Sequence, residues 1–143
     1  MKALEKRDIP RGGETILIVD DDKAVLYLCK LQLESIGYTA FIESCPKAAL
    51  SHFARRPYTF DLVITDYEMM PFNGGELATA ISRIRADIPI IAYTGNPASA
   101  YRHAVFSEVI AKTASIKDIA SKIRHVLDMS QAPMDNVSLQ NGV

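Results

Sequence analysis

Five short apolar runs alternate along the chain with stretches whose apolar residues recur at helical spacing, and no other feature limits the fold as strongly. The runs are predicted to be β-strands at residues 15–20, 38–42, 60–65, 88–93 and 107–111. Strands that are apolar throughout are typical of sheets covered by helices on both faces. Because the links are short and contain helical crossovers, we expect parallel pairing with right-handed connections. The sequence therefore predicts a doubly wound α/β domain.

Four amphipathic helices are predicted between or after these strands, over about residues 23–36, 45–56, 75–86 and 116–127. Asp21 or Asp22 is expected to cap the first helix, and Ser44 the second. The stretch 96–106 is expected to hold at most a short helix. The residues predicted to face inward are Val25, Leu28, Leu31 or Gln32, and Ile36 in the first helix; Ala49, Leu50 and Phe53 in the second; Leu77, Ala80, Ile81 and Ile84 in the third; and Ile116, Ile119, Ala120, Ile123, Val126 and Leu127 in the last.

The chain of 143 residues is long enough for one domain with its own core. We predict an N-terminal arm or linker over residues 1–13, a single domain over 14–129 and a disordered polar tail over 130–143. Cys29 and Cys45 lack the spacing of metal ligands. Cys29 falls in a helical apolar pattern, which predicts a small core residue.

The charge balance argues against some classes of partner. The net charge is −1, from 16 basic and 17 acidic residues, so composition indicates neither a nucleic-acid surface nor a membrane surface. No apolar run approaches the ~20 residues that span a bilayer, and the charged start lacks the apolar part of a secretory signal. We therefore expect a cytoplasmic protein without direct nucleic-acid contact.

Chemically active side chains follow four of the predicted strands at the point where each strand ends. Asp20 and Asp21 follow the first strand, Asp66 the third, Thr94 the fourth and Lys112 the fifth. Open parallel sheets bind ligands beyond the carboxyl ends of their strands, at the switch in strand order; in the order 2-1-3-4-5 this switch lies between strands one and three. Clustered carboxylates repel one another, and Mg²⁺ offsets this cost because it prefers oxygen ligands. The pattern predicts a magnesium-dependent phosphoryl site.

Each of these residues has an ordinary explanation when it is taken alone. Acids after a strand often cap a helix, a single Asp66 could be a loop acid, and a single Lys112 could be a solvated surface residue. Their coincidence at four strand ends, in this order, favours one shared site. The three histidines are expected to be surface residues without partners; they are His52, His103 and His125.

With these positions in place, the chain resembles a response-regulator receiver domain of two-component signalling over about residues 14–128. The runs GGETILIVDDD and FDLVITDYEMM, and the pair Thr94-Gly95, are similar to receivers fused behind the core of hybrid histidine kinases. The resemblance implies a flavodoxin-like fold with five parallel strands in the order 2-1-3-4-5. It leaves open whether the chain stands alone or is a fragment of a hybrid kinase.

The resemblance also implies a role for each site residue. Asp66 would accept a phosphoryl group from a phosphohistidine of a histidine kinase or phosphotransfer protein. Asp20 and Asp21 would hold Mg²⁺, with Asp66 and the backbone carbonyl of Glu68 as further ligands. The Thr94 hydroxyl and the Lys112 ammonium would contact phosphoryl oxygens. Physical reasoning agrees, because phosphoryl transfer mainly needs charge neutralised on the equatorial oxygens.

Four departures from the family pattern lie in or near the site. Thr113 replaces the usual proline after Lys112, so a trans peptide is expected there. Only 112 − 94 = 18 positions separate Thr94 from Lys112, so helix four is predicted to be shortened or missing. Val109 stands where the family has a switch aromatic, for which Phe106 or Tyr101 could substitute. Met70 holds a usual proline position, with Pro71 one residue later.

Three functions remain open at this point. The leading hypothesis is a phosphoacceptor, not an enzyme, that switches contact with a protein effector and could form a homodimer. The alternative is a pseudo-receiver, a binding module that keeps the fold and signals without phosphorylation. A small aspartyl-phosphate phosphatase is a third hypothesis, weakened because Glu68 stands where such enzymes place a second aspartate.

Overall fold

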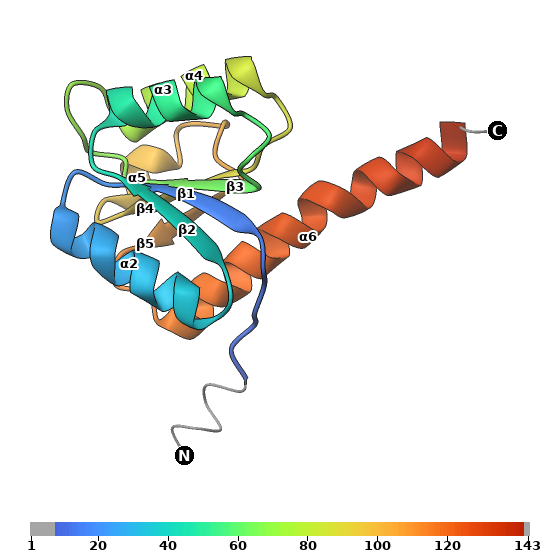
Figure 1. Ribbon diagram of the computed structural model, residues 1–143, viewed down its shortest axis with the longest axis horizontal. Helices are drawn as coiled ribbons and strands as arrows, with labels where there is room; N and C mark the ends of the chain where they lie inside the picture. Colours follow the sequence, from blue (N-terminus) through green and yellow to red (C-terminus); the bar gives the residue numbers. More distant parts are fainter. Residues whose placement is uncertain (1–7, 142–143) are drawn as a thin grey trace.

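The computed structural model describes residues 8–141, with side chains described as far as residue 130. Five parallel strands form one sheet in the order β2-β1-β3-β4-β5, which confirms the predicted fold class and strand order (Figure 1). The strands are β1 (Thr15–Val19), β2 (Thr39–Glu43), β3 (Leu62–Thr65), β4 (Ile90–Thr94) and β5 (Glu108–Ala111).

Helices cover both faces of this sheet (Figure 1). The helices are α2 (Lys23–Ser35), α3 (Pro46–Arg55), α4 (Gly74–Ile84), α5 (Pro97–Ala100) and α6 (Ile116–Asn141). Ile16 and Ile18 of β1 pack with α2 and α6 on one face, whereas Leu17 and Val19 pack with α3 and α4 on the other. This division follows from the alternation of side chains along a strand. None of the helices in the described part of the chain is long and apolar enough to cross a membrane.

The starts of α2 and α4 follow from capping side chains. Asp22 caps α2, since its Oδ1 accepts from the backbone N–H groups of Ala24 and Val25 at 3.0 and 3.3 Å. Asn73 and Glu76 form a reciprocal capping box at α4. The predicted cap of α3 is wrong. Cys45, not Ser44, holds that position without a side-chain bond, because Pro46 fits the first turn and places the cap directly before it.

The inward face of α2 also differs from the prediction. Leu26, Cys29 and Leu33 are buried, whereas Leu28 and Leu31 are 57% and 63% exposed. Apolar residues surround much of this helix, so helical spacing alone fits more than one face. In α4, the predicted inward residue Ile84 is 41% exposed. Cys29 is a core residue as predicted, and burial raises the pKa of its thiol to about 12.

The predicted inward residues of α3 and α6 are largely confirmed. Ala49 and Phe53 are buried in α3, and the buried residues of α6 are Ile119, Ala120, Ile123, Val126 and Leu127. The backbone of α6 continues to Asn141 and extends away from the sheet (Figure 1). The domain bounds and the tail over residues 130–143 stay predictions.

Residues just before β1 are held at the amino end of the sheet. The Arg124 guanidinium of α6 binds both carboxylate oxygens of Glu14, at 3.0 and 2.6 Å, and the Asp128 carboxylate at 2.9 Å. The hydrogen bond from Arg124 lowers the pKa of Glu14. Gly12 N–H donates to the carbonyl of Ile36 at 3.2 Å. The chain is therefore fixed to α2 and α6 before it enters β1.

Candidate functional site

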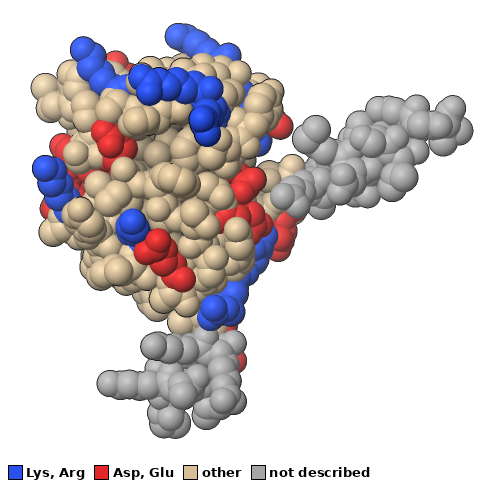
Figure 2. All heavy atoms as spheres, viewed as in Figure 1, with Lys and Arg blue, Asp and Glu red and all other residues tan. Residues whose placement is uncertain are grey.

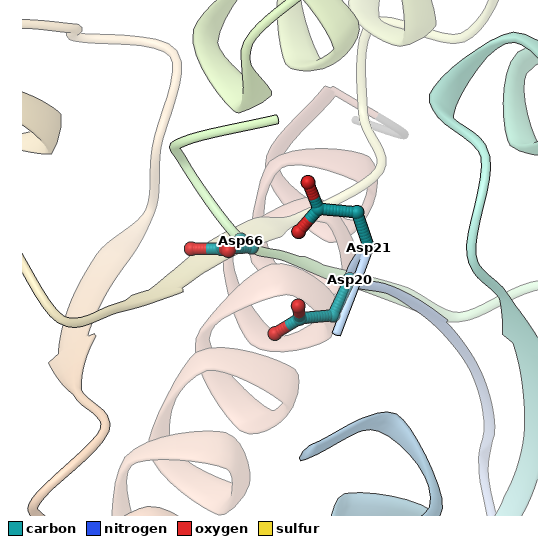
Figure 3. A group of neighbouring side chains, drawn as sticks. All are labelled: Asp20, Asp21 and Asp66. Carbon is teal, nitrogen blue, oxygen red and sulfur yellow. The ribbon is translucent and has the colours of Figure 1, made fainter. Parts of the chain in front are cut away.

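Three carboxylates meet at the carboxyl ends of β1 and β3. The pairing of Val19 with Thr65 sets these strand ends side by side, and Asp20, Asp21 and Asp66 follow directly. One oxygen from each carboxylate lies within 4.8 Å of the others (Figure 3). Asp20 and Asp66 are 2% and 7% exposed, whereas Asp21 faces solvent. The predicted acidic cluster is therefore present.

Backbone N–H groups orient two of these carboxylates. Asp22 N–H donates to Asp20 Oδ1 at 2.9 Å, and Tyr67 N–H donates to Asp66 Oδ1 at 2.8 Å. Tyr67 is fixed in turn, since its carbonyl accepts from Gly74 N–H at 2.7 Å. A Cβ at Gly74 would collide with the backbone carbonyl of Asp66. The loop that carries the acidic cluster is thus packed directly against the start of α4.

The Lys112 ammonium joins this cluster from the end of β5. Its Nζ lies 2.8 Å from Asp20 Oδ2 and 3.2 Å from Asp66 Oδ2. Strand pairing delivers it there, because Lys112 N–H donates to the Thr94 carbonyl at 3.0 Å, one step beyond the pairing of β4 with β5. Within residues 8–141 the only cis peptide is Met70–Pro71, so the bond to Thr113 is trans as predicted. Lysine placement here does not need the usual proline.

The charges of the site are unbalanced, with three carboxylates facing one ammonium. Burial and the nearby Asp20 charge raise the pKa of Asp66, and Lys112 opposes this shift only in part. Burial lowers the pKa of Lys112, but its ion pairs with both carboxylates outweigh burial and raise it. The site therefore holds excess negative charge in a partly desolvated place.

The donor set fits a hard divalent cation such as Mg²⁺. Its oxygens converge from three carboxylates. Asp20 Oδ2 is buried, and its partner within the described residues is the Lys112 ammonium at 2.8 Å, which leaves part of its acceptor capacity unused. A buried oxygen with unused acceptor capacity is costly unless a cation or another donor completes it.

A family model, the response regulator receiver domain, matches residues 16–124. The chain belongs to this receiver family. The two-component response regulator ARR14 of Arabidopsis thaliana is 34% identical over 80 residues, which are 56% of this chain and 21% of that protein. The aerobic respiration control sensor protein ArcB of Escherichia coli is 25% identical over 132 residues, which are 88% of this chain and 17% of ArcB. The receiver thus spans about a fifth of the length of these relatives.

Solved structures agree with this assignment. A CheY-like receiver domain protein from Methanospirillum hungatei superposes with a TM-score of 0.76 and 27% identity, covering 85% of this chain and 99% of that one. TrrA from Thermotoga maritima, solved in complex with Mg²⁺ and BeF, gives a TM-score of 0.71 and 29% identity over 79% of this chain and 98% of that one. The doubly wound sheet predicted from the strand pattern and the receiver fold implied by the resemblance are both confirmed.

Two further predicted residues, Thr94 and Glu68, are joined through Asn96. Thr94 ends β4 and is 1% exposed, and its Oγ1 accepts from Asn96 N–H at 3.1 Å. The exposed Glu68 carboxylate accepts from the Asn96 side chain at 3.2 Å. The Glu68 carboxylate is not part of the acidic cluster. Its backbone carbonyl as a magnesium ligand, and the Thr94 hydroxyl as a donor to phosphoryl oxygens, stay predictions.

The prediction that His103 has no partner is wrong. His103 Nε2 lies 2.8 Å from the Tyr67 hydroxyl, and His103 packs against Phe106. Sequence reasoning missed this pair because 36 positions separate the two residues and His103 belongs to no motif. The only available signal was the position of Tyr67 directly after Asp66.

The region between β4 and β5 is reduced, as the sequence predicted. Helix α5 has four residues, Pro97–Ala100, and the α5–β5 segment (residues 101–107) leads on to β5. Of the two aromatics considered as substitutes near Val109, Phe106 is half-buried against it and Tyr101 is 66% exposed. Only Phe106 therefore lies in the interior of this region.

Proposed function

We propose that this receiver accepts a phosphoryl group on Asp66, from a histidine kinase or a phosphotransfer protein, and thereby switches contact with a protein effector. The observation that carries the proposal is the Lys112 ammonium, which lies within 3.2 Å of both Asp20 and Asp66. An acceptor carboxylate, an acidic cation site and a fixed positive charge are the parts that phosphoryl transfer needs.

The transfer begins with an Asp66 carboxylate oxygen as nucleophile. An O–P bond forms while the P–N bond of the donor phosphohistidine breaks, and the bonding electron pair returns to the imidazole nitrogen. Asp66 Oδ2 faces Lys112, and Oδ1 accepts from Tyr67 N–H. Lys112 would balance the charge on the equatorial oxygens, and the Thr94 hydroxyl would donate to one of them.

Asp20, Asp21 and Asp66 would hold Mg²⁺, with the Glu68 carbonyl as a further ligand. When bound, this cation would favour the ionised form of Asp66 and neutralise phosphoryl oxygens. The raised pKa of Asp66 makes such charge compensation more important here, because only the ionised carboxylate attacks phosphorus.

The remaining predictions about this chain form part of the same proposal. We infer that the receiver comprises residues 14–129, that it works in the cytoplasm as an acceptor and not as a catalyst, and that its output is a protein contact. Nothing specific favours the pseudo-receiver alternative. Its motivation was Thr113 and the shortened α5, and Lys112 still reaches both carboxylates.

Intact-mass spectrometry after incubation with acetyl phosphate and Mg²⁺ tests the proposal. The wild type is expected to gain the mass of one phosphoryl group, and Asp66→Asn is expected to gain none. Asp22→Asn is a matched control, since it removes a charge from the same acidic run while asparagine can still cap α2. An unmodified wild type, or a modified Asp66→Asn protein, would contradict the assignment of the acceptor.

A further inference from the structure

His103 joins three parts of the receiver close to the acidic cluster. Its Nε2 lies 2.8 Å from the Tyr67 hydroxyl, with ring centroids 5.3 Å apart. It also packs edge-to-face against Phe106 at 6.1 Å. At the start of α4 the His103 ring lies over Gly75, where a Cβ would come within 2.9 Å of the ring. His103 therefore connects three parts of the chain: the loop that follows Asp66, helix α4 and the α5–β5 segment.

Tyr67 connects His103 to the acceptor itself. Its backbone N–H donates to Asp66 Oδ1 at 2.8 Å, while its hydroxyl reaches His103 at the far end of a rigid ring. A shift of the Tyr67 backbone therefore moves the hydroxyl that His103 contacts. Other links in this region include the packing of Tyr67 and Phe106 against the cluster of Ala92, Ala100 and Val109. The Asn96 side chain also donates to Glu68 at 3.2 Å, but the Tyr67–His103 hydrogen bond is the one that ends in the α5–β5 segment.

We propose that the Tyr67–His103 hydrogen bond relays the phosphorylation state of Asp66 to the α5–β5 segment, with His103 as a positioning residue. The proposal rests on the proposed function. A hydrogen bond to a carboxylate is roughly twice as strong as one to a neutral oxygen. Phosphorylation turns the Asp66 carboxylate into an acyl phosphate, so Tyr67 N–H loses the anionic acceptor that now fixes it. The Tyr67 backbone then shifts, and its hydroxyl moves relative to His103.

The His103 backbone passes the change on through the α5–β5 segment. Its N–H donates to the Ala100 carbonyl at 3.1 Å, and its carbonyl accepts from Phe106 N–H at 3.3 Å. His103 also forms part of the wall of a cleft of about 420 Å³ along α4, with Phe72, Gly75 and Arg83. A displaced His103 ring therefore alters both the backbone of this segment and the shape of that cleft.

Beryllofluoride with Mg²⁺, followed by amide ¹H–¹⁵N spectra, tests the relay without a kinase. In the wild type we expect shifts at residues 20–22 and 66–68, which report occupancy at Asp66, and at residues 101–107, which report the relay. Tyr67→Phe keeps the ring and removes the hydroxyl. It is expected to retain the first set of shifts and to reduce the second set by about half or more, because the hydrogen bond that transmits the change is gone.

Three further variants separate the hydrogen bond from general packing. His103→Leu removes the ring nitrogen that bonds to the Tyr67 hydroxyl and keeps an apolar contact with Phe106, so it should reproduce the Tyr67→Phe result even if that variant folds poorly. His103→Gln offers an amide oxygen to the Tyr67 hydroxyl and should restore most of the 101–107 shifts. Tyr101→Phe removes an exposed hydroxyl from the same segment and should behave as wild type.

The outcomes distinguish two kinds of failure. A wild type without shifts at residues 20–22 and 66–68 would overturn the proposed function, and the relay with it. Normal occupancy at Asp66 combined with wild-type shifts at 101–107 in Tyr67→Phe and His103→Leu would overturn the relay alone. The relay also fails if occupancy at Asp66 leaves residues 101–107 of the wild type unchanged.

Discussion

The two halves of the strand-end site are built differently. At the ends of β1 and β3, Asp20 and Asp66 are buried, oriented by backbone N–H groups and supported by full-length helices. At the ends of β4 and β5, the covering helix α5 has four residues and Thr113 follows the lysine. Nevertheless, the Lys112 ammonium reaches both acids.

This difference shows that strand pairing positions the reactive side chains, whereas the helices and loops around them can vary. Lys112 is positioned by the pairing of β4 with β5, which continues to its own N–H. The helix and the following residue can therefore change without moving the lysine. By contrast, a conformational change transmitted through the α5–β5 segment depends on the shortened helix α5. We expect acceptor chemistry to be ordinary for a receiver and the route of output to be specific to this chain.

The largest expected effect is the loss of Lys112. Lys112→Ala should slow phosphoryl uptake from acetyl phosphate by about 10²- to 10³-fold, comparable to removing one charge-stabilising donor from a transition state. Mass spectrometry over a time course measures this rate. A loss below about tenfold would mean that the lysine does not act on the phosphoryl group, and the comparison between the two halves would lose its basis.

Truncating a buried side chain should lower the free energy of unfolding more near β1 and β3 than near β4 and β5. Leu33→Ala removes a fully buried side chain of α2 beside β1 and should lower the free energy of unfolding by about 2–5 kcal/mol. Val109→Ala acts in the small cluster with Ala92 and Ala100 and should cost about 1–2 kcal/mol. Urea unfolding measures both. The exposed Leu31 offers a control, since Leu31→Ala should change stability by no more than about 0.5 kcal/mol.

The Asp66 carboxylate should also make the free energy of unfolding depend on pH. Because the pKa of Asp66 is raised on folding, the native state binds its proton more readily. The free energy of unfolding contributed by this group therefore falls as pH rises above its ordinary value of about 3.9. Without metal, Asp66→Asn should be more stable than wild type at about pH 7, because asparagine carries no charge to desolvate.

Denaturant melts with a chelator, from about pH 4 to about pH 7, measure this difference. The gain of Asp66→Asn should shrink toward the acidic end, where the wild-type carboxyl is protonated. Adding Mg²⁺ should also reduce the gain, since a ligand that binds only the native wild type stabilises it. A gain that is constant across this range would contradict the assigned direction of the pKa shift.

The smallest effect is expected from Thr113→Pro. If strand pairing alone places Lys112, restoring the family's usual proline should alter the rate of phosphoryl uptake by less than about threefold, a change below ~0.7 kcal/mol. The time course described for Lys112→Ala measures it. An acceleration of tenfold or more would show that the peptide after the lysine does control its position.

The fold and the acidic cluster could be predicted because their signals are local or repeat in a simple way. Asp20, Asp66, Thr94 and Lys112 each end a strand, and parallel pairing brings such ends to one edge of the sheet. The short α5 followed from counting residues between Thr94 and Lys112. Parallel strands leave little freedom at these positions.

The predictions for α2 and His103 were wrong because the local sequence pattern does not determine which tertiary contacts form. Apolar residues occupy more than one side of α2, so spacing could not tell Leu33 from Leu31 as the buried residue. The partner of His103 lies 36 positions away, in a segment without regular structure. Contacts of this kind depend on loop geometry, which neither periodicity nor strand order fixes.

The Arg124–Glu14 pair has a mechanical consequence. It ties the incoming backbone to the departing helix α6 at the end of the sheet opposite Asp66. A pull on the backbone before β1 or on α6 would therefore act first on this ion pair, which lies away from the acidic cluster. The loops around Asp66 can therefore rearrange without breaking the tie between Glu14 and α6.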